Sequence, residues 1–221
     1  MIGPGFWILE NVFSHAECDR FYRYLPQEVT HRNRAGVRNL MAVPEISGLA
    51  TDDRLLKIGE TITGAKLVPY KATLFEKNAK ANWLVSFHQD TALPLESVVE
   101  MEGWGPSSNK QGVTFVHSPT WALSKILAIR VHLDASTKLN GPLRVIPNSH
   151  HERIRNDTDF ARYIENGNEV ECLVGKGGVI AMSPLLIHAS SKSVNTDSRR
   201  VLHIEYARSL DLGQGIRLSI A

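Results

Sequence analysis

The feature that most restricts the fold of this chain is a series of short strand-like segments that begins after Gly64. These segments are rich in β-branched and aromatic residues, and turn residues such as the Asn-Gly-Pro run at 140–142 separate them. They are residues 67–75, 83–87, 113–116, 126–133, 143–146, 170–174, 179–182 and 201–206. About eight short strands with such turns predict a mainly β fold, a double-stranded β-helix of the jelly-roll, cupin-like kind.

Two segments before the strands have the pattern of helices. Ser14 and Glu17 form a capping box, and apolar residues at helical spacing follow as far as Leu25. A second helical pattern runs over residues 51–64. We therefore expect N-terminal α-helices that flank one sheet, and no helix later in the chain. The stretch over residues 91–112 has little periodicity and is expected to be a long loop, of the kind that often acts as a lid.

Size, charge and cysteine content limit the class of protein. At 221 residues the chain is expected to form one domain, residues 1–221, with a full hydrophobic core. A net charge of +2 is too small to indicate nucleic acid or an anionic membrane as a partner, although basic residues cluster at 31–38. No segment approaches the roughly 20 apolar residues of a membrane helix. Cys18 and Cys172 do not make a disulfide framework, which fits a reducing cytoplasm.

A histidine followed two positions later by an acidic residue occurs five times. The pairs are His15/Glu17, His88/Asp90, His132/Asp134, His150/Glu152 and His203/Glu205. Such a pair, joined by a distant histidine, could supply the two imidazoles and one carboxylate that bind iron in non-haem Fe(II) oxygenases. His88 and Asp90 follow a predicted strand, in which residues two apart point the same way, and His188 could return on a facing strand. Spacing alone favours this pair only modestly over the other four.

Three longer motifs occur in a defined order along the chain. Residues 82–90 read NWLVSFHQD, residues 141–150 read GPLRVIPNSH, and residues 184–206 read PLLIHASSKSVNTDSRRVLHIEY. Each resembles a motif of the phytanoyl-CoA dioxygenase family of Fe(II)/2-oxoglutarate oxygenases, and the similarity extends from about Phe6 to Ala207. Three motifs in the right order are far more specific than a single histidine–acid pair.

The resemblance implies a set of site residues. His88, Asp90 and His188 would be the iron ligands. Arg199, eleven residues after the distal histidine as in the family, would bind the far carboxylate of 2-oxoglutarate through its planar fork of donors. Ser190 would add a hydrogen bond to that carboxylate.

Alternation along the last strand leaves a choice between two neighbouring arginines. Arg199 shares a face with His203 and Glu205, whereas Arg200 shares the apolar face. We favour Arg199, because helices can cover the apolar face of a jelly roll while the polar face lines the site. The candidates for substrate binding are Trp104, Lys71 and Thr73.

The resemblance also implies a reaction that uses Fe(II), 2-oxoglutarate and O2. Such an enzyme hydroxylates a small-molecule substrate and releases succinate and CO2. Asp90 favours hydroxylation, because related halogenases lack the carboxylate and bind chloride in its place. Two alternatives stay open at this point: a non-redox metalloenzyme on a cupin-like barrel, which would not need Arg199, and a non-catalytic binding module on the same barrel.

Overall fold

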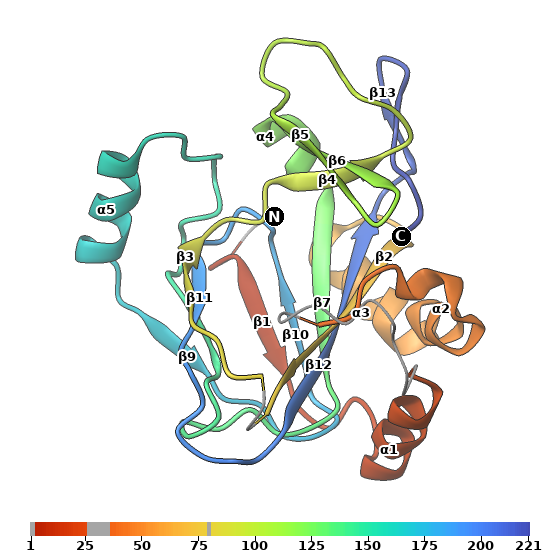
Figure 1. Ribbon diagram of the computed structural model, residues 1–221, viewed down its shortest axis with the longest axis vertical. Coiled ribbons are helices and arrows are strands. Elements are labelled where there is room, and N and C mark those ends of the chain that lie inside the picture. The colour runs from red at the N-terminus through yellow and green to blue at the C-terminus, as the bar shows by residue number, and fades with distance from the viewer. Residues whose placement is uncertain (1–2, 26–35, 79–80) are drawn as a thin grey trace.

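The computed structural model describes residues 3–25, 36–78 and 81–221, and two antiparallel sheets form its centre (Figure 1). The larger sheet contains, in spatial order, β1 (Phe6–Leu9), β10 (Val179–Met182), β7 (Ile126–His132), β12 (Arg199–Ala207) and β2 (Val68–Lys77). The smaller sheet contains β3 (Val85–His88), β11 (His188–Ser190), β8 (Leu143–Val145) and β9 (Val170–Cys172). The predicted mainly β jelly roll is confirmed. The basic cluster at 31–38 falls largely outside the described residues.

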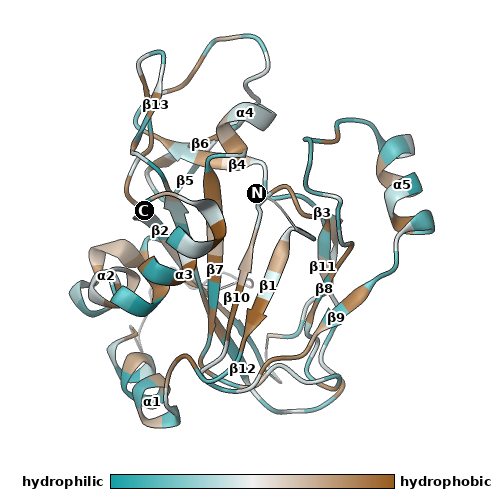
Figure 2. Ribbon diagram, turned by 180° about the vertical axis from the view of Figure 1, so that it is seen from behind, coloured by the Kyte–Doolittle hydropathy of each residue, from teal (hydrophilic) through white to brown (hydrophobic). Residues whose placement is uncertain are grey.

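Three helices cover the outer face of the larger sheet (Figures 1 and 2). They are α1 (His15–Tyr24), α2 (Pro44–Ala50) and α3 (Asp53–Thr63). Apolar side chains of the sheet and the helices form one buried cluster, which joins Leu202 and Ile204 of β12 to Cys18 of α1 and Leu55 of α3. Burial of this apolar surface holds the helices on the sheet. The opposite, inner face of the sheet is therefore free to carry polar side chains.

The ends of the two predicted helices agree with the sequence signals. Ser14 Oγ accepts from the Glu17 backbone N–H at 3.3 Å, and the Ser14 N–H donates to the Glu17 carboxylate at 2.8 Å. Asp52 caps α3, and Gly64 ends it with a φ of +67°. The short helix α2 was not predicted, since seven residues hold little periodicity. No helix in the described part of the chain is long and apolar enough to cross a membrane.

The predictions of a loop over 91–112 and of no later helix are wrong. β4 (Ala92–Leu95) and β5 (Ser107–Lys110) lie within that stretch and pair with β6 (Val113–His117), and α5 (Asp157–Asn166) follows the smaller sheet's β8. β5 consists of exposed polar residues, and α5 buries no residue completely, so neither produces a strong hydrophobic pattern. The remaining short elements are η1 (Leu40–Ala42), α4 (Thr120–Leu123), β13 (Asp211–Gly213) and β14 (Ile216–Arg217).

A buried polar network lies on the inner face of the larger sheet. Arg130 Nη1 of β7 lies 3.1 Å from His203 Nδ1, and His203 Nε2 lies 3.3 Å from a Glu205 carboxylate oxygen. The same carboxylate accepts from Lys71 Nζ at 2.6 Å and from Tyr70 OH at 2.7 Å. Buried polar groups of this kind are stable only when they are paired. The network therefore fixes the side chains that surround the space between the two sheets.

Candidate metal centre

Three potential metal ligands meet at one end of the smaller sheet. His88 is the last residue of β3, and His188, the first residue of β11, pairs with it in register. Asp90 follows two residues after β3, and its backbone N–H donates to Pro184 O at 2.8 Å. One ligand atom of each side chain lies within 4.8 Å of the other two. Within the described ranges, this is the one group of three such side chains close enough to share a metal ion.

Both histidine rings present Nε2 to Asp90. The Nε2 atoms of His88 and His188 lie 3.6 Å and 3.5 Å from the two carboxylate oxygens. On the far side of each ring, Nδ1 lies 2.9 Å from Ser86 O in His88 and 2.8 Å from Leu186 O in His188. Because a carbonyl oxygen can only accept, each Nδ1 carries a hydrogen, and in the neutral form of each ring Nε2 keeps the lone pair that could bind a metal. Hydrogen bonds of this kind orient histidine ligands in metal sites.

The charges of the three side chains suit a divalent cation. Burial raises the pKa of Asp90, but the neighbouring His188 and His88 rings outweigh burial, so the pKa lies well below its usual value. Burial lowers the pKa of His188 to about 4, which leaves this imidazole neutral at neutral pH. Burial also lowers the pKa of His88, yet the Asp90 carboxylate leaves it raised overall. One anionic and two imidazole donors are a common ligand set for Fe(II).

A cavity of about 90 Å³ between the sheets is lined by the three ligands and by Arg199. The Arg199 side chain is buried, and its Nη2 donates to Ser190 Oγ at 3.4 Å. Its Nε and Nη1 are buried without a hydrogen-bond partner. Burial lowers the pKa of Arg199 to about 9, so the guanidinium remains charged at neutral pH. A buried cation with two unused donors is costly until an anion binds to it. These residues therefore fit a carboxylate ligand such as 2-oxoglutarate.

Lys77 belongs to the same cavity and was not identified from the sequence. It pairs in register with Arg199, and its Nζ donates to Ser190 Oγ at 2.7 Å and to Ser191 O. Burial and the nearby Arg199 lower the pKa of Lys77 to about 7. The predicted strand ended at Phe75, two residues too early, although the alternation of that strand points to Lys77.

The remaining predicted residues lie outside this cavity. Lys71 is bound to Glu205 in the polar network, and Thr73 is buried opposite His203 on the adjacent strand. Trp104 packs edge to face against Trp121, with ring centroids 5.8 Å apart.

Arg200 points away from the cavity, on the opposite face of β12. It forms an ion pair with Asp134 at 2.5 Å, and its guanidinium stacks on the Tyr22 ring at 3.8 Å from the centroid. Of the two candidate arginines, Arg199 is thus the one that lines the cavity with the three ligands. His132, the alternative ligand, is buried with its Nδ1 at 3.1 Å from Ser136 Oγ.

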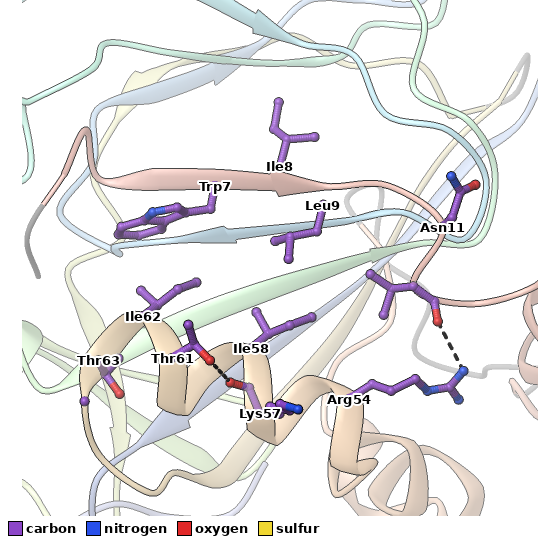
Figure 3. A pocket seen from close by; sticks show the side chains of 12 residues that line it. Trp7, Ile8, Leu9, Asn11, Arg54, Lys57, Ile58, Thr61, Ile62 and Thr63 are labelled. Atoms are coloured by element: carbon purple, nitrogen blue, oxygen red, sulfur yellow. Dashed lines mark hydrogen bonds between the residues drawn. The ribbon is translucent and has the colours of Figure 1, made fainter.

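A more voluminous cavity, of about 1060 Å³, lies between β1 and α3 (Figure 3). Its wall is largely apolar, with Trp7 and Leu9 on one side and Ile58 and Ile62 on the other. None of its lining residues is a histidine, cysteine, aspartate or glutamate. Volume alone therefore does not identify the site, and the smaller cavity beside His88 is the one with metal-binding chemistry.

Comparison with solved structures supports the fold. AviO1 from Streptomyces viridochromogenes Tue57 is similar over 93% of this chain and 90% of its own, with 20% identity and a TM-score of 0.65. The α-ketoglutarate-dependent carbocyclase SnoK from nogalamycin biosynthesis covers 99% of this chain and 83% of its own, with 17% identity and a TM-score of 0.72. EctD from S. alaskensis, solved with 2-oxoglutarate and 5-hydroxyectoine, covers 92% and 72%, with 20% identity and a TM-score of 0.68.

The sequence comparisons agree with the three motifs. A search of curated proteins gives no significant match. The family model described as phytanoyl-CoA dioxygenase (PhyH) matches residues 3–201, which include the His88, Asp90 and His188 cluster and Arg199. The chain therefore belongs to the phytanoyl-CoA dioxygenase family of Fe(II)- and 2-oxoglutarate-dependent oxygenases.

Proposed function

We propose that His88, Asp90 and His188 hold Fe(II) and that Arg199 and Ser190 anchor 2-oxoglutarate beside it. The observation that carries this proposal is the buried, unpaired guanidinium of Arg199 in the cavity that the three ligands line. A planar guanidinium can bind a carboxylate through two parallel hydrogen bonds. When bound, Fe(II) and 2-oxoglutarate supply with O2 the oxidising chemistry that converts a C–H bond to C–OH, with succinate and CO2 as co-products.

The side chains of the cavity match the charge of a dicarboxylate. Lys77, Arg130 and Arg199 are three buried basic groups in its wall, and Asp90 is its one carboxylate. Arg130 contacts the His203 ring and lies over the Phe75 ring, and it has no acidic ion-pair partner among the described residues. A dianion bound between the metal and Arg199 would offset this excess of positive charge, whereas a neutral ligand would leave it uncompensated.

The proposed reaction is hydroxylation of a small molecule. The Asp90 carboxylate is present, and this favours hydroxylation over halogenation for the reason given above. A non-redox metalloenzyme would have no use for a buried cation such as Arg199 behind its metal, and a binding module would have no use for three oriented ligands. An oxygenase therefore accounts for both the three ligands and the buried Arg199, whereas each alternative accounts for only one of them.

Anaerobic titration with Fe(II) and 2-oxoglutarate tests the proposal. We expect the visible charge-transfer band of the chelate in the unaltered protein, its loss in His88→Ala and Asp90→Ala, and weaker 2-oxoglutarate binding in Arg199→Ala. His151→Ala is the matched control and should keep the band, because His151 is exposed and does not line this cavity. A band that persists in His88→Ala, or metal-dependent turnover that needs neither O2 nor 2-oxoglutarate, would contradict the proposal.

A further inference from the structure

We propose that a second cavity beside His88 binds the primary substrate and selects a molecule that carries a carboxylate or phosphate on an apolar body. This inference rests on the proposed function, because it takes the metal to lie at His88. The cavity has a volume of about 420 Å³. His88 lines both this cavity and the narrow one that leads to Arg199. A molecule bound here would lie against the metal site on the side away from the co-substrate anchor.

Two arginines give this second cavity its charge. Arg153 Nη1 donates to Ser118 O at 3.1 Å and to Gly103 O at 3.4 Å, and Arg155 Nη2 donates to Gly103 O at 3.2 Å. These carbonyl groups orient the two guanidinium groups but do not neutralise them. Neither arginine has an acidic partner among the residues that the structure describes. The donors left over on both side chains are therefore available to an anion.

Two arginines outside the cavity, unlike Arg153 and Arg155, form ion pairs with acidic residues. Arg144 pairs with Glu169 at 3.1 Å, and Arg162 of α5 pairs with Asp159 at 3.3 Å. The one carboxylate in the cavity wall, Asp157, is the first residue of α5, where a negative charge stabilises the helix N-terminus. Its presence is thus explained without an ion pair to the arginines.

The rest of the wall is suited to an apolar body. Phe87, Ile154 and Phe160 contribute apolar surface, and none of them is completely buried, so part of each side chain is available for contact. His117, also in the wall, is held through Nδ1 at 2.6 Å from Thr91 Oγ1. Burial and the nearby Arg153 lower the pKa of His117, which leaves this ring neutral at neutral pH. Two charged groups in a partly aromatic wall recognise an amphiphilic anion better than a neutral polar solute.

Gln89 ties the arginine segment to the metal ligands. It lies between His88 and Asp90 in the sequence, its Nε2 donates to Glu152 O at 2.9 Å, and its Oε1 accepts from the Ile154 N–H at 2.9 Å. These two hydrogen bonds bracket Arg153. The distance between the anion-binding donors and the metal is thereby set by the protein, so an anchored substrate would present one part of its body to the metal.

The inference is tested with pairs of probes that share an apolar body and differ in whether the head group is charged. The probes are 4-phenylbutanoate against 4-phenylbutanamide, and 3-phenylpropyl phosphate against 3-phenylpropanol. Binding to the metal-loaded protein is measured by calorimetry in the presence of 2-oxoglutarate. We expect at least one anion to bind roughly tenfold more tightly than its neutral partner, as one charge-assisted contact allows. The stronger pair then shows whether the site prefers a carboxylate or a phosphate.

The variants Arg153→Gln and Arg155→Gln, alone and together, should reduce this preference to about twofold or less. Arg162→Gln, which alters an exposed arginine of the helix α5 that follows, should keep the preference in full. Equal binding of charged and neutral probes, no binding of any anion at about 1 mM, or an unchanged preference in the double variant would overturn the inference. The 2-oxoglutarate chelate band, recorded separately for each variant, reports on the proposed function alone, because neither arginine lines the co-substrate cavity.

Discussion

Replacing Arg199 by methionine should have opposite effects on stability and on co-substrate binding. Without a ligand, the protein holds this guanidinium buried, and burial lowers its pKa from its usual value to about 9. At about 1.4 kcal/mol for each pKa unit, this shift corresponds to a cost of roughly 5 kcal/mol for keeping the charge at neutral pH. Local relaxation and the lost contact with Ser190 reduce the benefit of removing it. We expect Arg199→Met to stabilise the ligand-free protein by about 1–3 kcal/mol.

The same substitution should weaken 2-oxoglutarate binding. A hydrogen-bonded contact between charged groups contributes about 1.5–3 kcal/mol, so its loss reduces affinity by roughly 10- to 150-fold. At a concentration of 100 times the original Kd, 2-oxoglutarate stabilises the unaltered protein by about 2.7 kcal/mol, but stabilises a variant with 100-fold weaker binding by only about 0.4 kcal/mol. For a chain of this size the difference corresponds to roughly 5–9 °C in the ligand-induced rise of Tm.

Thermal unfolding of the metal-loaded protein, without O2 and with and without 2-oxoglutarate, measures both effects. Arg200→Met is the matched control, because Arg200 lies on the opposite face of β12 in an ion pair with Asp134. This control should lower the stability of the ligand-free protein and keep the ligand-induced rise in Tm. The reasoning is refuted if Arg199→Met keeps the full rise, or if it destabilises the ligand-free protein as much as Arg200→Met does.

Three further predictions concern the neighbouring groups. Lys77→Met should weaken 2-oxoglutarate binding and flatten its pH dependence. The pKa of Lys77 is about 7 without ligand and rises when an anion binds, so the affinity of the unaltered protein for 2-oxoglutarate falls as the pH rises above 7. An equal pH dependence of this affinity in the variant would contradict the prediction. His188→Ala should weaken Fe(II) binding by roughly 100-fold or more, measured by metal titration, and a smaller loss would exclude it as a ligand. Glu205 has a pKa of about 2 in the folded protein and 4.5 in the unfolded chain. Its contribution of roughly 3 kcal/mol to the free energy of unfolding is therefore present above pH 4.5 and is lost as the pH falls toward 2. Urea unfolding at several pH values should show this loss, and Glu205→Gln should abolish this part of the pH dependence.

The sequence was sufficient for the parts of the fold that depend on regular alternation. In β12, Arg199 lines the cavity, and His203 and Glu205 of the same face belong to the polar network, while Leu202 and Ile204 face the helices, as the period of two predicts. Elements with little buried surface could not be predicted, because β5 is polar throughout and α5 buries no residue completely.

The candidate site shows the same limit. The three potential ligands were identified by motif, and the geometry brings them together. Lys77 was missed because its role depends on pairing with Arg199, a residue more than a hundred positions away. The role proposed for Arg153 and Arg155 could not be predicted, because the feature that distinguishes them, the lack of an ion-pair partner among the described residues, exists only in three dimensions.

The two hydrogen bonds of Gln89 to the 152–154 backbone have a thermodynamic consequence. If loading of the ion restrains residues 88–90, it also restrains the arginine-bearing segment, and the entropy lost there is no longer a cost when the second molecule arrives. Thermodynamic linkage then requires reciprocity. A molecule bound at Arg153 must raise the affinity for the ion by the same factor by which the ion raises the affinity for that molecule. One amide side chain would thereby make the two occupancies cooperative.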